Sequence, residues 1–121
     1  MSLYQDIVNI IGEYIGTYEL RKWIDINKID WDWLSTNPNA IDLLKTNQNK
    51  IDWFWLSKNP NAIDLLKANP EKIDWKWLSK NPNAIDLLKL NQDKIVWVYL
   101  SENPSIFKYK PRKIDCALFE L

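Results

Sequence analysis

The fold is decided by one 22-residue stretch of the sequence, Lys72-Ile-Asp-Trp-Lys-Trp-Leu-Ser-Lys-Asn-Pro-Asn-Ala-Ile-Asp-Leu-Leu-Lys-Leu-Asn-Gln-Asp93. The 22 residues before it, from Lys50 to Glu71, differ from it at only four positions. A third copy runs from Lys28 to Asn49, and a fourth begins at Lys94 and loses the pattern after Pro104. Tandem copies at a fixed period indicate a repeat protein, in which each unit buries its apolar face against its neighbours.

Each copy contains two signals for the start of a helix. Asn-Pro recurs at positions 37–38, 59–60, 81–82 and 103–104, and a second asparagine recurs at Asn47, Asn69 and Asn91. Asparagine is a preferred N-cap residue, and proline suits the first position of a helix because its missing N–H has no partner there anyway. The spacing therefore predicts two helices of about 8–10 residues in each copy.

The apolar residues of each copy recur at helical spacing, which predicts one buried face on each helix. In the quoted copy the predicted core consists of Ile73, Trp75, Trp77, Leu78, Ala84, Ile85, Leu87 and Leu88. We therefore predict an all-α fold, an α-solenoid of short helical hairpins with two helices per repeat. The alternative is an LRR-like β/α solenoid, because residues 73–77 alternate between apolar and polar as a strand does and the period suits leucine-rich repeats.

We expect a single domain with three parts. Residues 1–27 form an N-terminal cap, with an amphipathic helix to about Ile15 and then a degenerate repeat. Residues 28–104 are the tandem repeats. Residues 105–121 form a C-terminal cap in which residues 113–119 repeat the pattern of the first helix. Terminal units of stacked arrays are usually atypical because one of their faces has no neighbour.

Composition excludes several classes of partner. Sixteen basic and sixteen acidic residues cancel, so no net field attracts nucleic acid or an anionic membrane. No uncharged run approaches the roughly 18 residues of a membrane span, and the start of the chain lacks the features of a signal peptide. The single Cys116 suggests a reducing compartment. We expect a cytoplasmic protein that binds neither nucleic acid nor membrane.

The sequence offers no candidate for catalysis. Histidine, the usual general base, is absent. The aspartates Asp30, Asp52 and Asp74 recur with the period, which favours a role at helix N-termini over a catalytic pair. The serines that follow the first helix are expected to hydrogen-bond back to the backbone, and Cys116 is expected to be a small core residue. We therefore predict that the protein is not an enzyme and has no catalytic residue, cofactor or metal site.

Comparison between copies identifies the candidate binding residues. One position of the first helix differs in chemistry in every copy and lies opposite the apolar face, and a second variable position follows it. The resulting candidates for partner binding are Asp32, Phe54, Lys76, Val98, Lys58 and Lys80. Stacked repeats present recognition surfaces in this way, and Phe54 is the best anchor because aromatic residues are favoured at binding hot spots. Neutral drift at a solvated position is the competing explanation.

We therefore predict a non-enzymatic repeat scaffold that mediates protein–protein interaction through this row. One alternative is a glycan or ligand binder that uses a ladder of Trp31, Trp53, Trp75 and Trp97, although invariant rings are more simply explained as core. Another is a structural protein that self-associates weakly through its terminal caps.

The motif Ile-Asp-Trp-x-Trp-Leu-Ser-x-Asn-Pro-Asn-Ala-Ile-Asp-Leu-Leu, over about residues 28–107, resembles the short tandem-repeat proteins that giant DNA viruses of the mimivirus and marseillevirus kind encode in many copies. The resemblance implies a location in the cytoplasm of a host cell and a host protein as partner. It brings no catalytic motif that could be transferred to this chain.

Overall fold

The computed structural model describes residues 2–4 and 16–113. In this part of the chain the elements are η1 (Ile26–Lys28), α2 (Trp31–Leu34), α3 (Ile41–Lys45), η2 (Gln48–Lys50), α4 (Trp53–Leu56), α5 (Ile63–Ala68), η3 (Pro70–Lys72), α6 (Trp75–Lys80), α7 (Ile85–Lys89), η4 (Gln92–Lys94), α8 (Trp97–Leu100) and η5 (Pro104–Ile106), where η denotes a 3-10 helix. The described residues contain no strand. The all-α prediction is confirmed, and the LRR-like alternative, which requires strands, is wrong for this part of the chain.

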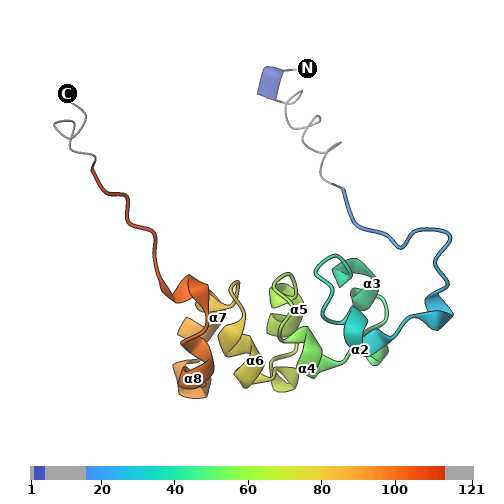
Figure 1. Cartoon of the computed structure of the whole chain (residues 1–121). Helices are drawn as coiled ribbons and strands as arrows, with labels where there is room; N and C mark the ends of the chain where they lie inside the picture. Colours follow the sequence, from blue (N-terminus) through green and yellow to red (C-terminus); the bar gives the residue numbers. More distant parts are fainter. Residues whose placement is uncertain (1, 5–15, 114–121) are drawn as a thin grey trace, which may run out of the picture.

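Each repeat contributes a 3-10 turn, a first helix and a second helix. Figure 1 shows the first helices α2, α4, α6 and α8 following one another in one row, with the second helices α3, α5 and α7 in a row beside them. Residues 107–113 lead away from this array (Figure 1). No helix within the described ranges has both the length and the apolar character needed to cross a membrane.

The first helix is shorter than predicted. The helix was expected to start at the second asparagine of the repeat, but the separate 3-10 turn η3 begins there instead. Ile73 and Asp74 then adopt extended backbone angles, and α6 begins at Trp75. The Asp74 carboxylate accepts the Trp77 N–H at 3.0 Å, so it caps α6 and restarts the chain in a helical direction. The α-helices of the array therefore contain only 4–6 residues each, not about 8–10.

The Asn-Pro pair is not the start of the second helix, so that prediction was wrong. Asn81 and Pro82 lie in a turn, in which the Asn81 side chain accepts the Asn83 N–H at 3.1 Å. The N-cap of α7 is Ala84, which makes no side-chain capping bond. The Asn81 side-chain oxygen closes this turn and does not cap α7, and its amide nitrogen makes a contact with the preceding repeat.

That contact is a pair of hydrogen bonds which recurs between repeats. The Nδ2 of Asn81 donates to the carbonyl oxygens of Ser57 at 3.1 Å and of Asn59 at 2.9 Å. Asn59 and Asn103 make the equivalent pairs with their own preceding repeats. All three asparagines are buried, with 1% of their surface exposed at most. An asparagine suits this place because its amide supplies two donors while its oxygen closes the local turn.

A serine makes the second recurring contact. The Ser57 hydroxyl donates to the Trp53 carbonyl at 2.8 Å, the local bond expected from the sequence, and also accepts the Asp74 N–H of the next repeat at 2.9 Å. Ser35 and Ser79 make the same two bonds. Neighbouring repeats are thus joined by a fixed set of polar bonds around an apolar centre.

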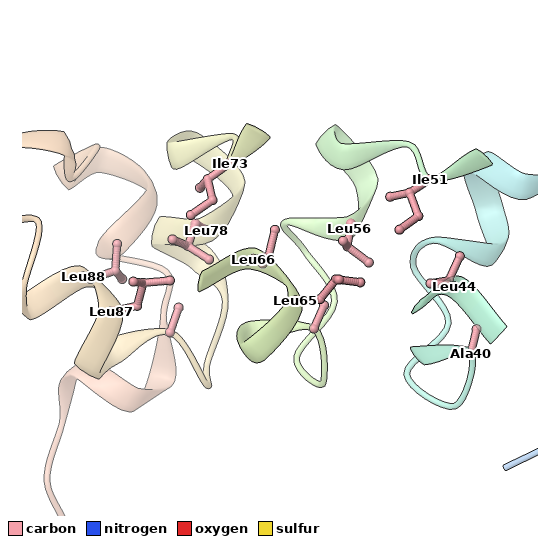
Figure 2. Packing of buried hydrophobic residues seen from close by; sticks show 12 residues of the cluster. Ala40, Leu44, Ile51, Leu56, Leu65, Leu66, Ile73, Leu78, Leu87 and Leu88 are labelled. Atoms are coloured by element: carbon pink, nitrogen blue, oxygen red, sulfur yellow. The ribbon is translucent and has the colours of Figure 1, made fainter. Parts of the chain in front are cut away.

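The apolar centre is a continuous row of small and branched side chains. Figure 2 shows it running from Ala40 and Leu44 at one end to Leu87 and Leu88 at the other. Of the predicted core of one copy, the residues that are buried are Ile73, Leu78, Ala84, Leu87 and Leu88. Trp75 and Ile85 are half-buried, and Trp75 packs against the row. Helices of one or two turns are unstable alone, so this packing holds the array together.

Two sequence predictions fall outside the described residues. The N-terminal amphipathic helix was predicted to continue to about Ile15, and residues 5–15 are not described. Residues 114–121 are not described either, and they include Cys116 and most of the segment with the first-helix pattern. The division into two caps and a central array stays a prediction.

Candidate interaction surface

The four side chains at the variable position of the first helix all face solvent. Each is the second residue of its helix, directly after the first tryptophan, in the order Asp32, Phe54, Lys76 and Val98. Phe54 is 41% exposed and Val98 is 75% exposed. At the first three positions the helix cap fixes this orientation, because the capping aspartate two residues earlier sets where the first turn begins.

Beside this row lies a stack of aromatic rings that the sequence analysis assigned to the core. It consists of Trp33, Trp55, Trp77 and Tyr99, here called the aromatic ridge. Successive ring centroids are separated by 5.4, 6.4 and 6.2 Å, and the two Trp–Trp pairs are stacked, with interplanar angles of 29° and 25°. None of the four residues is fully buried, and Trp33 is 65% exposed.

Phe54 joins the variable row to the aromatic ridge. Its ring meets Trp55 at 5.1 Å and Trp77 at 5.6 Å, edge to face in both cases, with interplanar angles of 87°. Aromatic rings prefer this arrangement over a face-to-face sandwich. The phenyl group therefore sits partly exposed on a firm support, as a hydrophobic anchor must.

Three lysines from variable positions surround the same rings. Lys58 Nζ lies 4.9 Å from the ring centroid of Trp55 and 4.2 Å from that of Trp77. Lys76 Nζ lies 4.8 Å from the Tyr99 ring, and Lys80 Nζ lies 5.2 Å from the Trp77 ring. A lysine over an aromatic face contributes about 0.5–1 kcal/mol at an exposed site. These contacts hold three positive charges on one surface.

Charge along the ridge is positive at its centre. A hydrogen bond with the Tyr99 side chain and the electrostatic attraction to it raise the pKa of Lys76 above its ordinary value, and the Asp74 carboxylate adds a smaller effect in the same direction. Lys76 therefore keeps its charge throughout the physiological range. Lys80 forms an ion pair with Glu102, with 2.9 Å between Nζ and Oε2. Lys58 and Lys76 form no ion pair within the described residues.

The structure thus brings four of the six candidate residues together, namely Phe54, Lys58, Lys76 and Lys80. Asp32 and Val98 hold the same helix position at the two ends of the row. The aromatic ridge itself was missed because both tryptophans of each copy are apolar and repeat with equal regularity. Only the restart of the helix at the aspartate fixes which of the two points outward.

The other tryptophan series, proposed as a ladder for sugars, has a different environment. Trp31, Trp53 and Trp75 are half-buried, and each carries on its ring a lysine from the following repeat. The Nζ-to-centroid distances are 4.7–5.0 Å for these pairs. A sugar could stack there only after the lysine had moved away. Trp97, which carries no lysine on its ring within the described residues, is 65% exposed.

The polar residues considered for catalysis have structural partners. Asp30, Asp52 and Asp74 each accept the N–H of the third residue of the following helix. The described residues contain no group of three or more acidic, cysteine or histidine side chains suited to a metal ion. The ridge is therefore the surface on which a functional argument can be built. Comparisons with protein-family models, curated proteins and solved structures find no match to this chain.

Proposed function

We propose that this protein is a non-enzymatic interaction module that binds an acidic segment of another protein along the aromatic ridge. The observation that carries the proposal is the convergence of Phe54, Lys58 and Lys76 on the stacked rings. A regular scaffold holds these side chains in place, while their chemistry changes from copy to copy. This combination is how repeat proteins obtain an individual binding specificity.

The rings supply the apolar part of the binding energy. Aromatic residues dominate interface hot spots because they bury a large area and lose little conformational freedom. The rings are already stacked on one another and half-exposed in the free protein. Little ordering is therefore required when a partner docks, which preserves affinity.

The lysines supply the selectivity for an acidic partner. Lys58 and Lys76 present cations that form no ion pair within the described residues, although the chain as a whole carries no net charge. A carboxylate near them gains an ion pair beside a low-dielectric aromatic surface. Binding of this kind weakens with added salt because exposed charges are screened.

A selection from a random-peptide display library tests the proposal. The parent chain is expected to enrich peptides that combine acidic residues with an aromatic or large aliphatic residue. The variant Phe54→Ala/Lys76→Ala removes the anchor and one cation, and should bind the enriched peptides at least about tenfold more weakly, equivalent to about 1.4 kcal/mol. Binding is measured by titration at two salt concentrations.

The matched control is Lys67→Ala/Leu90→Ala, which also removes one lysine and one exposed apolar side chain, but from the second helices and their ends. It should bind like the parent. Peptides without an acidic bias, or equal loss of binding in both double variants, would contradict the proposal. A host protein as partner, a cytoplasmic location and the relationship to giant-virus repeat proteins stay predictions.

A further inference from the structure

Neighbouring repeats are joined by one recurring contact, in which donors of one repeat meet acceptors of the repeat before it. One end of the array exposes the donor half of this contact, and the other end exposes the acceptor half. Inside the array, each repeat offers donors to the repeat before it and acceptors to the repeat after it. The first repeat has donors with no preceding array repeat, and the last has acceptors with no following one. Each half can be identified residue by residue from the 22-residue period.

The N-terminal end carries the donor half. Asn37 stands in the place of Asn59 and Asn81, yet it is exposed and its Nδ2 has no acceptor within the described residues. Asn39 stands in the place of Asn61, whose Nδ2 donates to the Pro38 carbonyl of the preceding repeat at 2.8 Å. Its own Nδ2 likewise has no acceptor among the described residues.

The C-terminal end carries the acceptor half. Ser101 stands in the place of Ser79, and its hydroxyl bonds back to the Trp97 carbonyl at 2.9 Å. Ser79 also accepts an N–H from the following repeat, whereas Ser101 accepts none from the described residues. Each buried asparagine amide binds two carbonyls of the preceding repeat, as Asn103 binds those of Ser79 and Asn81. One period later, the equivalent carbonyls are those of Ser101 and Asn103.

The aromatic contacts are divided in the same way. Tyr99 ends the aromatic ridge and Trp33 begins it, so a stack of two arrays would place one against the other. Lys94 covers Trp75, whereas no lysine of the described residues covers Trp97, and Lys28 is the period equivalent of Lys94. Trp33 and Trp97 are each 65% exposed, whereas the other tryptophans of the array are half-buried.

The N-terminal end is also hollow. A cleft of about 540 Å³ lies between residues 18–24 and the first repeat, where Leu34, Ala40 and Leu43 line it. Leu34 and Leu43 are only half-buried there, whereas their counterparts one repeat later, Leu56 and Leu65, are buried. The apolar surface that an earlier repeat would cover is thus left partly open to solvent.

From these matched halves we propose that the C-terminal end of one copy of this chain docks on the N-terminal end of a second copy. The contact continues the inter-repeat contact across two molecules. The Asn37 amide binds the Ser101 and Asn103 carbonyls, the Asp30 N–H binds the Ser101 hydroxyl, and Tyr99 stacks on Trp33. Because the two surfaces differ, the contact is heterologous and adds further copies in a line. The proposal does not depend on what the aromatic ridge binds.

Sedimentation velocity on the full chain, from about 1 µM to about 1 mM, measures the association. The parent is expected to show a mass that rises with concentration past that of a dimer. Asn37→Asp keeps the oxygen that accepts the Asn39 N–H and replaces the donor with a carboxylate. It should weaken association at least about tenfold, because a carboxylate cannot donate to the two carbonyls.

A mixing experiment tests the polarity of the contact. Ser101→Arg places a long side chain over the acceptor end, at an exposed position. At concentrations at which the parent associates and each variant alone is monomeric, an equimolar mixture should form a 1:1 dimer. Nothing larger should form, because the intact acceptor end of one variant pairs with the intact donor end of the other and only the two altered ends remain. Circular dichroism must show parent-like helix content in both variants.

A parent chain that stays monomeric throughout the concentration range would overturn the proposal. So would a dimer that is unaffected by Asn37→Asp, or a mixture that stays monomeric while the parent associates. Loss of peptide binding in the Phe54→Ala/Lys76→Ala variant with unchanged association separates this contact from the function of the ridge.

Discussion

At the residue scale, one asparagine per repeat accounts for the strict spacing of the copies. The Asn81 amide spans to two carbonyls of the preceding repeat while its oxygen holds the turn that follows. A longer glutamine would not fit the turn, and an aspartate could not donate. The residue is conserved between copies because three groups in a buried space depend on it.

Replacement of Asn81 by alanine should therefore be costly. The Ser57 carbonyl would lose its Asn81 donor in a buried space, at about 1–3 kcal/mol for an unsatisfied group, and the Asn59 carbonyl would keep only the bond from the Ala62 N–H. We expect a loss of about 2–4 kcal/mol in the free energy of unfolding, measured by urea denaturation at low protein concentration. Asn37→Ala is the control, since its amide has no such partners, and should cost less than about 1 kcal/mol. Equal losses in the two variants would contradict this role.

The sequence predicts the apolar positions of the fold better than the polar ones. Leu78, Ala84 and Leu88 are buried as their spacing indicated, because apolar side chains that recur at a helical period lie on one face of the helix, and this face packs against the core. Asn81 was misassigned because a capping asparagine and an asparagine that bridges repeats look alike locally. Its recurrence in every copy was the available signal, since a mere cap tolerates serine, threonine or aspartate.

At the element scale, the restart of the chain at Asp74 determines which side chains form the aromatic ridge. If one helix had continued from Pro70, as predicted, the directions of the Trp75 and Trp77 side chains around the helix axis could be calculated by counting residues from Pro70. The extended residues Ile73 and Asp74 reset these directions. Trp77 then stacks in the aromatic ridge, and Trp75 packs against the core. A helical projection of the sequence could not show this.

The helix α8, the first helix of the fourth repeat, lacks the aspartate cap. It therefore allows the contribution of the cap to stability to be tested. Val96 occupies the capping position of α8 and makes no side-chain capping bond. Val96→Asp should restore the bond to the Tyr99 N–H that Asp74 makes with Trp77. Compared with Val96→Ala, which has no acceptor, we expect about 1 kcal/mol of added stability. The thermal midpoint should be about 4–8 °C higher. Identical midpoints for the two variants would show that the aspartate does not cap α8.

At the scale of the whole molecule, stability should be a sum over repeats and the contacts between them. Each contact consists of the asparagine pair, the serine bond and the apolar packing, and it is nearly identical from one repeat to the next. The aromatic ridge grows in the same additive way, because each repeat adds one ring to the stack. The exposed side chains of the first helices, such as Phe54 and Lys76, therefore differ from copy to copy without any change in the contacts that stabilise the array.

Insertion of a second copy of the 22 residues 72–93 after Asp93 tests this additivity. Both new junctions reproduce a contact that the array already makes, so the chain should fold and unfold at a higher urea concentration. The slope of the unfolding free energy against urea concentration scales with the surface that is exposed on unfolding. Because one repeat is added to about four, this slope should rise by about a quarter. A 21-residue insertion that omits Leu90 displaces Asn103 relative to its carbonyls by one residue and should destabilise the array. If both insertions had the same effect, added length rather than register would explain the stability, and the asparagine contact would lose the role assigned to it.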